Sequence, residues 1–209
     1  MYLFARTATA KPGRALDAAT FATEVAGQVS SITGVEVHAW STLYGAPITQ
    51  LSWTALIDSH AAMGEVSEKL QADPGFQERI GVAGELFEAA PEDVFAEVVA
   101  TVNDSGKLGT YANLVQAQVA GGKIGDAMAF AVDMLNHVGK VTGRDGLLTR
   151  SLYGPWASMG WIMLAHSLEE IDAAGEAMAA DADYISKIDK AGDLFLPGSG
   201  HVQLSQRIH

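Results

Sequence analysis

The chain has 209 residues, a formal net charge of −12, 48% hydrophobic residues and no cysteine. A surface this acidic repels phosphate backbones and anionic bilayers, so neither nucleic acid nor a membrane is an expected partner. The lack of cysteine excludes disulfides, thiolate nucleophiles and thiolate metal sites. The first residues are too polar for a secretion signal, and no apolar run reaches the ~20 residues of a membrane span. We therefore expect a cytoplasmic protein.

The sequence is one unit written twice. Leu43-Tyr44-Gly45 recurs as Leu152-Tyr153-Gly154, an offset of 109 residues, which becomes 108 after a one-residue deletion near Gln50. Over residues 2–45 and 52–99 the two copies share 25 of 92 aligned positions, several-fold more than composition alone would give. We predict a first module over residues 1–101, a polar glycine-containing linker over 102–110, and a second module over 111–209.

Each copy is predicted to run strand, helix, strand, strand, helix, strand. The first strands cover residues 2–10 and 111–119, and the helices that follow carry apolar residues at i, i+3, i+4 and i+7 spacing and end at Thr33-Gly34 and Thr142-Gly143. A strand pair follows in each copy, at 35–45 and 48–58, then at 146–154 and 158–166. Ser59 and Ser167 precede the second helices as N-caps. We expect the last strands to begin near Gly84 and Gly192.

This order of elements is that of a ferredoxin-like sandwich. Small acidic modules with a hairpin between the second and third strands, and an irregular stretch before the last, resemble the dimeric α/β-barrel superfamily. That group includes antibiotic-biosynthesis-monooxygenase-like, NIPSNAP-like and stress-responsive proteins. The resemblance covers nearly the whole chain. It implies an α+β fold of two tandem ferredoxin-like βαββαβ modules with antiparallel sheets, packed as a dimeric-type α/β barrel around a ligand cavity. A homodimer is a further possibility.

Strand alternation predicts which side chains would line such a cavity. Val35, Val37, Ala39 and Leu43 form an apolar set that should pack on helices, which leaves a mixed aromatic and hydroxyl set on the other face. We predict ligand-binding roles for Trp40, Thr42, Tyr44 and Thr54, and for Ser151 and Tyr153 of the second copy. Arg6 is a further candidate, for an acidic ligand. The alternative is that these side chains only pack against a partner sheet.

Three residues are candidates for catalysis. Asp58 and His166 occupy equivalent positions in the two copies, and a carboxylate that orients an imidazole is a common general-base arrangement. The alternative is that both simply end their strands in solvent. His38, beside Trp40, is a second candidate base, although a half-buried strand histidine is often structural. The second copy has Leu147 and Thr149 at these positions, so only one copy would carry that chemistry.

The function that these patterns favour is binding of a small apolar or aromatic molecule, with activity as a cofactor-independent oxygenase or isomerase. Two alternatives are kept: a haem-binding barrel with His38 as axial ligand, and a non-enzymatic stress or assembly protein of the same fold. No set of residues has metal-ligand spacing, and no phosphate-binding or serine-hydrolase motif is present.

Overall fold

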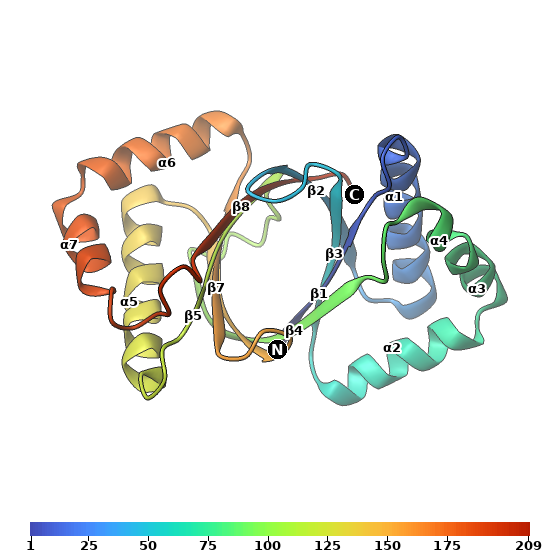
Figure 1. Ribbon diagram of the computed structural model, residues 1–209, viewed down its shortest axis with the longest axis horizontal. Helices are drawn as coiled ribbons and strands as arrows, with labels where there is room; N and C mark the ends of the chain where they lie inside the picture. Colours follow the sequence, from blue (N-terminus) through green and yellow to red (C-terminus); the bar gives the residue numbers. More distant parts are fainter. The chain divides into compact units, whose positions relative to one another are not determined.

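The computed structural model describes residues 1–209 and has the predicted α+β architecture, with the strands in the closed-barrel order β1-β3-β2-β8-β5-β7-β6-β4. Figure 1 labels the helices and strands. The strands are β1 (Tyr2–Thr9), β2 (Val37–Tyr44), β3 (Gln50–Ile57), β4 (Glu92–Val102), β5 (Tyr111–Gln118), β6 (Gly146–Tyr153), β7 (Ser158–Ala165) and β8 (His201–Arg207). The helices are α1 (Ala15–Thr33), α2 (His60–Ala72), α3 (Pro74–Gly81), α4 (Ala83–Leu86), α5 (Ile124–Thr142), α6 (Leu168–Ala180) and α7 (Ala182–Lys190). No helix is both long and apolar enough to cross a membrane.

The chain divides into two compact units. The first unit comprises Met1–Ala96 and Ser205–His209, and the second comprises Glu97–Leu204. The strands β4 and β8 each have residues in both units, because each copy ends in a strand whose last residues belong to the other unit.

The two units repeat the same strand pairing, as the sequence repeat predicts. Antiparallel β1 and β3 align Tyr2 with Ile57 and Thr9 with Gln50. In the second unit, β5 and β7 align Tyr111 with Ala165 in the same way. The middle strands β2 and β6 pair with the other edges of β3 and β7. The predicted strand pairs are therefore confirmed.

In each unit the helices cover one face of the sheet, as Figure 1 shows for α1 beside β1–β3 and for α5 beside β5–β7. Both long helices end where the Thr-Gly pairs predict. Gly34 and Gly143 adopt φ values of 80° and 68°, a left-handed conformation that residues with a Cβ seldom adopt. This reverses the chain so that β2 and β6 can begin.

Each unit has its own apolar core between the sheet and its helices. In the first unit the helix-facing side chains of β2 and β3, which include Val37, Ala39 and Trp53, pack against α1. The indole N–H of Trp53 donates to the carbonyl of Ala22 over 2.9 Å. In the second unit Trp161 makes the equivalent bond to Ala131, also 2.9 Å. The duplication has thus kept both the ring and its hydrogen bond.

The second helices begin at the predicted N-caps. The Ser59 hydroxyl accepts a hydrogen bond from the Ala62 N–H at 3.0 Å, and the Ser167 hydroxyl accepts one from the Glu170 N–H at 3.3 Å. These bonds satisfy backbone donors that the first turn of a helix leaves unpaired.

The region after these helices differs from the prediction. The stretch taken as irregular holds α3, α4 and α7, and the last strands begin at Glu92 and His201 instead of near Gly84 and Gly192. Helix α7 starts at the N-cap Asp181, whose carboxylate accepts the Tyr184 N–H at 2.7 Å and lies 3.0 Å from His137 Nε2. The two longer ones, α3 and α7, have only 8 and 9 residues, too few turns for their apolar spacing to stand out in the sequence.

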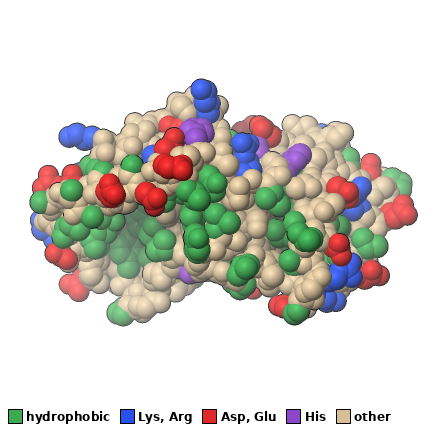
Figure 2. Space-filling model, turned by 90° about the horizontal axis from the view of Figure 1, so that it is seen from above, with side chains coloured by type: hydrophobic (Ala, Val, Ile, Leu, Met, Phe, Trp, Pro, Cys, Tyr) green, Lys and Arg blue, Asp and Glu red, His purple; other side chains and the backbone are tan.

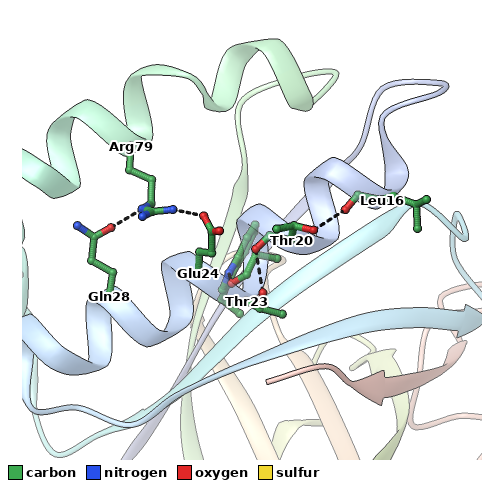
Figure 3. A network of polar contacts seen from close by, with 8 residues as sticks. Leu16, Thr20, Thr23, Glu24, Gln28 and Arg79 are labelled. Carbon is green, nitrogen blue, oxygen red and sulfur yellow. Dashed lines mark hydrogen bonds and ion pairs between the residues drawn. The ribbon is translucent and has the colours of Figure 1, made fainter.

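Helix α3 is held to α1 by a polar network (Figure 3). Arg79 of α3 donates through Nε to Gln28 Oε1 at 2.7 Å and pairs with the Glu24 carboxylate. Nearby on α1, the Thr20 hydroxyl donates to the carbonyl of Leu16. The contacts of Arg79 hold α3, a helix that the sequence did not predict, against α1 within the first unit.

Candidate functional site

The sheet of the first unit has a second face, which its own helices do not cover. Because strand side chains alternate, His38 and Trp40 lie on the opposite face of β2 from the core residues Val37 and Ala39. Their partners in register on β3 are Thr54 and Ser52. We call these four residues the His38 face.

His38 is the ionisable side chain of this face. It is 18% exposed, and its Nε2 lies 3.6 Å from Glu36 Oε1. Burial lowers the pKa of His38 below the ordinary value for histidine; Glu36 opposes this shift, while Arg207 and His209 add to it. A lowered pKa keeps the imidazole neutral at pH 7, so it can accept a proton.

Trp40 lies next to His38 on the same face. It is only 5% exposed although it belongs to neither core cluster, and its indole N–H donates to Thr54 Oγ1 at 2.8 Å. Thr42, two residues further along β2, is also buried. Tyr44 ends the strand and is exposed. The structure therefore brings His38, Trp40 and Thr54 together and leaves Tyr44 at the edge.

Arg6 lies apart from this face. It is in register with the core residue Trp53, and its guanidinium forms two hydrogen bonds to the Asp93 carboxylate, at 2.7 and 2.8 Å. The hydrogen bond to Asp93 is the main cause that raises the pKa of Arg6, against the effect of burial. Arg6 thus already has a carboxylate partner within the chain.

The equivalent residues of the second unit are less aromatic. Ser151 is half-buried on β6 and Tyr153 is exposed at its end. Thr149, also on β6 and two residues before Ser151, is buried, and its hydroxyl donates to the carbonyl of Gly160 at 3.2 Å. The second unit therefore lacks the imidazole and indole of the His38 face.

Asp58 and His166 each follow the last residue of a strand, β3 and β7, and both are exposed. The backbone N–H of His166 donates to Glu170 Oε2 at 2.7 Å. His166 also lines a pocket of about 570 Å³ that lies wholly in the second unit, between the end of α5 and the residues that follow it, the end of β7 and helix α6. Figure 2 shows the surface hollowed in this unit, on the left, with hydrophobic side chains in the hollow.

The polar side chains of this pocket include one that sequence reasoning missed. Arg144, directly after the C-cap Gly143, lines the pocket together with Asp145, His166 and Glu170. Arg144 could have been found by comparing the two copies, because the first copy has Val35 at the equivalent position. A change from an apolar residue to arginine at a half-buried position marks a place where the copies have diverged.

No known family profile and no curated protein matches the chain. Solved structures do match it. A candidate monooxygenase from Fusobacterium nucleatum subsp. nucleatum superposes with a TM-score of 0.75 at 8% identity, over 100% of this chain and 92% of that one. An anthrone oxidase-like protein gives 0.71 at 15% identity, over 100% and 91%. A candidate chlorite dismutase gives 0.56 at 8%, over 100% and 96%. At these identities the likeness shows the fold, and it confirms the tandem α/β-barrel resemblance.

Proposed function

We propose that this tandem α/β-barrel protein binds a planar aromatic molecule at the His38 face and that His38 takes a proton from it, as in a cofactor-independent oxygenase. The single observation that carries the proposal is the half-buried imidazole of His38, whose pKa burial lowers, beside a buried tryptophan. An aromatic ring provides apolar area, and a general base is most effective when its pKa lies near the working pH. The likeness to an anthrone oxidase-like protein supports an aromatic substrate.

Anthrone is the probe that fits this chemistry. It has an acidic methylene group, and removal of one proton by His38 Nε2 would leave a carbanion that the aromatic rings stabilise. Reaction with dioxygen then gives a hydroperoxide, and loss of water gives anthraquinone. One anthrone and one dioxygen yield one anthraquinone and one water, so dioxygen is the oxidant and no bound cofactor is needed.

The test is to follow dioxygen uptake and anthraquinone formation with purified protein. His38→Ala should lower the rate about 100-fold or more, the usual contribution of a general base. The wild-type rate should fall as the pH drops through the lowered pKa of His38, below about 6.5. His201→Ala, at an exposed histidine of β8, is the matched control. Equal rates for wild type and His38→Ala would overturn the assignment of His38.

The equivalent pair Asp58 and His166 provides a second assignment for the base. We propose the His38 assignment first because both Asp58 and His166 are exposed, whereas burial is what holds an imidazole neutral. His166→Ala should therefore leave the rate unchanged. A loss of rate in His166→Ala, with none in His38→Ala, would move the base to the strand ends.

Haem is the alternative ligand of this face, with His38 as axial ligand. A neutral imidazole can serve either as a proton acceptor or as an axial ligand of haem. An absorbance spectrum after addition of hemin tests this. A Soret band that shifts in wild type and is lost in His38→Ala would favour the haem-binding alternative.

A further inference from the structure

The second unit has a pocket beside α6, which we name the α6 pocket. Its apolar lining comes from Ala173, Ala174 and Ala177 of α6 and from Val141 and Leu164. Its charged and imidazole lining comes from Arg144, Asp145, His166 and Glu170. With a volume of about 570 Å³ it has the size of a small-molecule site.

Arg144 is the unpaired cation of this pocket. Its Nε donates to the carbonyl of Leu164 at 2.8 Å, and its Nη2 donates to the carbonyl of Met163 at 3.0 Å. Both acceptors are neutral, so they orient the guanidinium without compensating its charge. Burial lowers the pKa of Arg144, and only the more distant Glu170 opposes this. A desolvated cation without an anionic partner is costly, and an anion that binds beside it removes that cost.

The two carboxylates of the pocket are already occupied by donors. Glu170 Oε2 accepts the backbone N–H of His166 at 2.7 Å. Asp145 accepts the backbone N–H of Ser105 at 3.1 Å and also its hydroxyl. These neutral donors hold the two carboxylates in place but leave their negative charges, so Arg144 is the group in the pocket to which an anion can bind.

The first unit has larger side chains at the positions equivalent to two of the pocket alanines. The position equivalent to Ala177 is Lys69, and the position equivalent to Ala174 is Val66. The Lys69 ammonium donates to the carbonyl of Thr33 at 3.2 Å, and Thr33 is the counterpart of the pocket residue Thr142. In the first unit, therefore, a lysine side chain crosses the space that two alanines leave open in the second.

We infer that the α6 pocket binds a small monocarboxylate with an apolar body, whose carboxylate pairs with Arg144 and whose body lies on the alanines of α6. A carboxylate suits the planar guanidinium, which can donate two parallel hydrogen bonds to it. A phosphate monoester, with its higher charge, is disfavoured by Asp145 and Glu170 and by the net charge of −12. This site is separate in sequence and chemistry from the His38 face and does not depend on the proposed activity.

Benzoate is the probe, with benzyl alcohol and phenyl phosphate as comparisons, and binding is measured by titration calorimetry and by ligand-observed NMR. Benzoate should bind wild type more tightly than either comparison does. Arg144→Gln should weaken benzoate binding about tenfold or more, because a hydrogen bond between charged groups is lost. Ala177→Lys, which restores the residue of the first copy, should abolish binding by filling the pocket.

Lys69→Ala in the first unit is the matched control. It opens the equivalent space, but Val35 stands where the second unit has Arg144, so it should add no second benzoate site. Circular dichroism establishes that each variant is folded. The inference is overturned if Ala177→Lys and Arg144→Gln, both folded, bind benzoate as wild type does, or if wild type prefers benzyl alcohol. None of these measurements involves turnover, so failure here leaves the His38 proposal standing.

Discussion

Replacing Leu135 by alanine should destabilise the second unit by several kcal/mol. Leu135 lies on α5, is fully buried and packs in the core of the second unit with Ala131 and Leu148. The change removes three carbon atoms, and at ~0.8 kcal/mol for each buried group the transfer term alone is about 2.4 kcal/mol. The cavity left behind raises the total to about 3–5 kcal/mol. For a chain of this length, that lowers the melting temperature by about 6–20 °C.

The assay is thermal and urea unfolding followed by far-UV circular dichroism. Leu16→Ala on α1 is the control, because Leu16 is 85% exposed and the same chemical change there should cost no more than ~0.5 kcal/mol. The helix propensities of leucine and alanine are close enough that they cannot account for the difference. If Leu135→Ala and Leu16→Ala unfolded at the same urea concentration, that result would contradict the burial of Leu135 between α5 and the sheet.

Three further predictions concern single hydrogen bonds and one charge. Trp161→Phe should lower the urea midpoint by an amount equivalent to about 1–2 kcal/mol, since the buried bond to Ala131 is lost. Ser59→Ala should cost about 1 kcal/mol by removing the N-cap of α2. Hydrogen bonds from Tyr184 and His137 lower the pKa of Asp181 in the folded protein. The ionised Asp181 carboxylate therefore stabilises the fold at pH values above ~3.9, the carboxyl pKa in the unfolded chain. This stabilisation is lost as the pH falls through the lower pKa of the folded state. The difference in urea midpoint between wild type and Asp181→Asn should therefore shrink from pH 7 toward acid.

Each of these has a defined contrary outcome. A Trp161→Phe midpoint equal to that of wild type would mean that the indole bond adds no stability. Ser67→Ala, which removes a hydroxyl that only donates within α2 to Met63, should be milder than Ser59→Ala, and the reverse order would contradict the N-cap assignment. A difference between Asp181→Asn and wild type that does not change with pH would exclude the ionised carboxylate as its source.

The sequence repeat predicted most of the fold because two copies report the same periodicity. The repeated residues Tyr44/Tyr153 and Trp53/Trp161 aligned the strands of the two copies, whose faces were then assigned by alternation. The first core cluster contains the predicted helix-facing residues Val37 and Ala39, with Val35 packed against it, but not Leu43. The N-caps Ser59 and Ser167 and the C-caps Gly34 and Gly143 depend on bonds within a few residues, which a local pattern can capture. What failed were the short helices. Helix α3 was signalled by the N-cap Asp73 and by Pro74 at its start, and α7 by the N-cap Asp181 and an apolar spacing over only 9 residues.

The candidate sites were only partly predictable, for a physical reason. The neighbours of His38 on its own and the adjacent strand follow from alternation and register, so its proximity to Trp40 and Thr54 was expected. The α6 pocket depends on volumes removed at Ala174 and Ala177 and on the direction of Arg144 after a helix end. No periodic pattern specifies the removed volumes or the direction of the arginine. A position-by-position comparison of the two copies would nevertheless have pointed to Arg144, Ala174 and Ala177.

The duplicated tryptophans give each unit its own reporter. Trp53 and Trp161 have matching surroundings, one in the core of each unit, while Trp156 is 85% exposed on the loop between β6 and β7. A variant that keeps Trp53 as its sole indole would report through its intrinsic fluorescence on the first unit, and one that keeps Trp161 would report on the second. Because the two tryptophans have nearly the same environment, any difference between their unfolding curves would measure how far the two units have diverged in stability since the duplication.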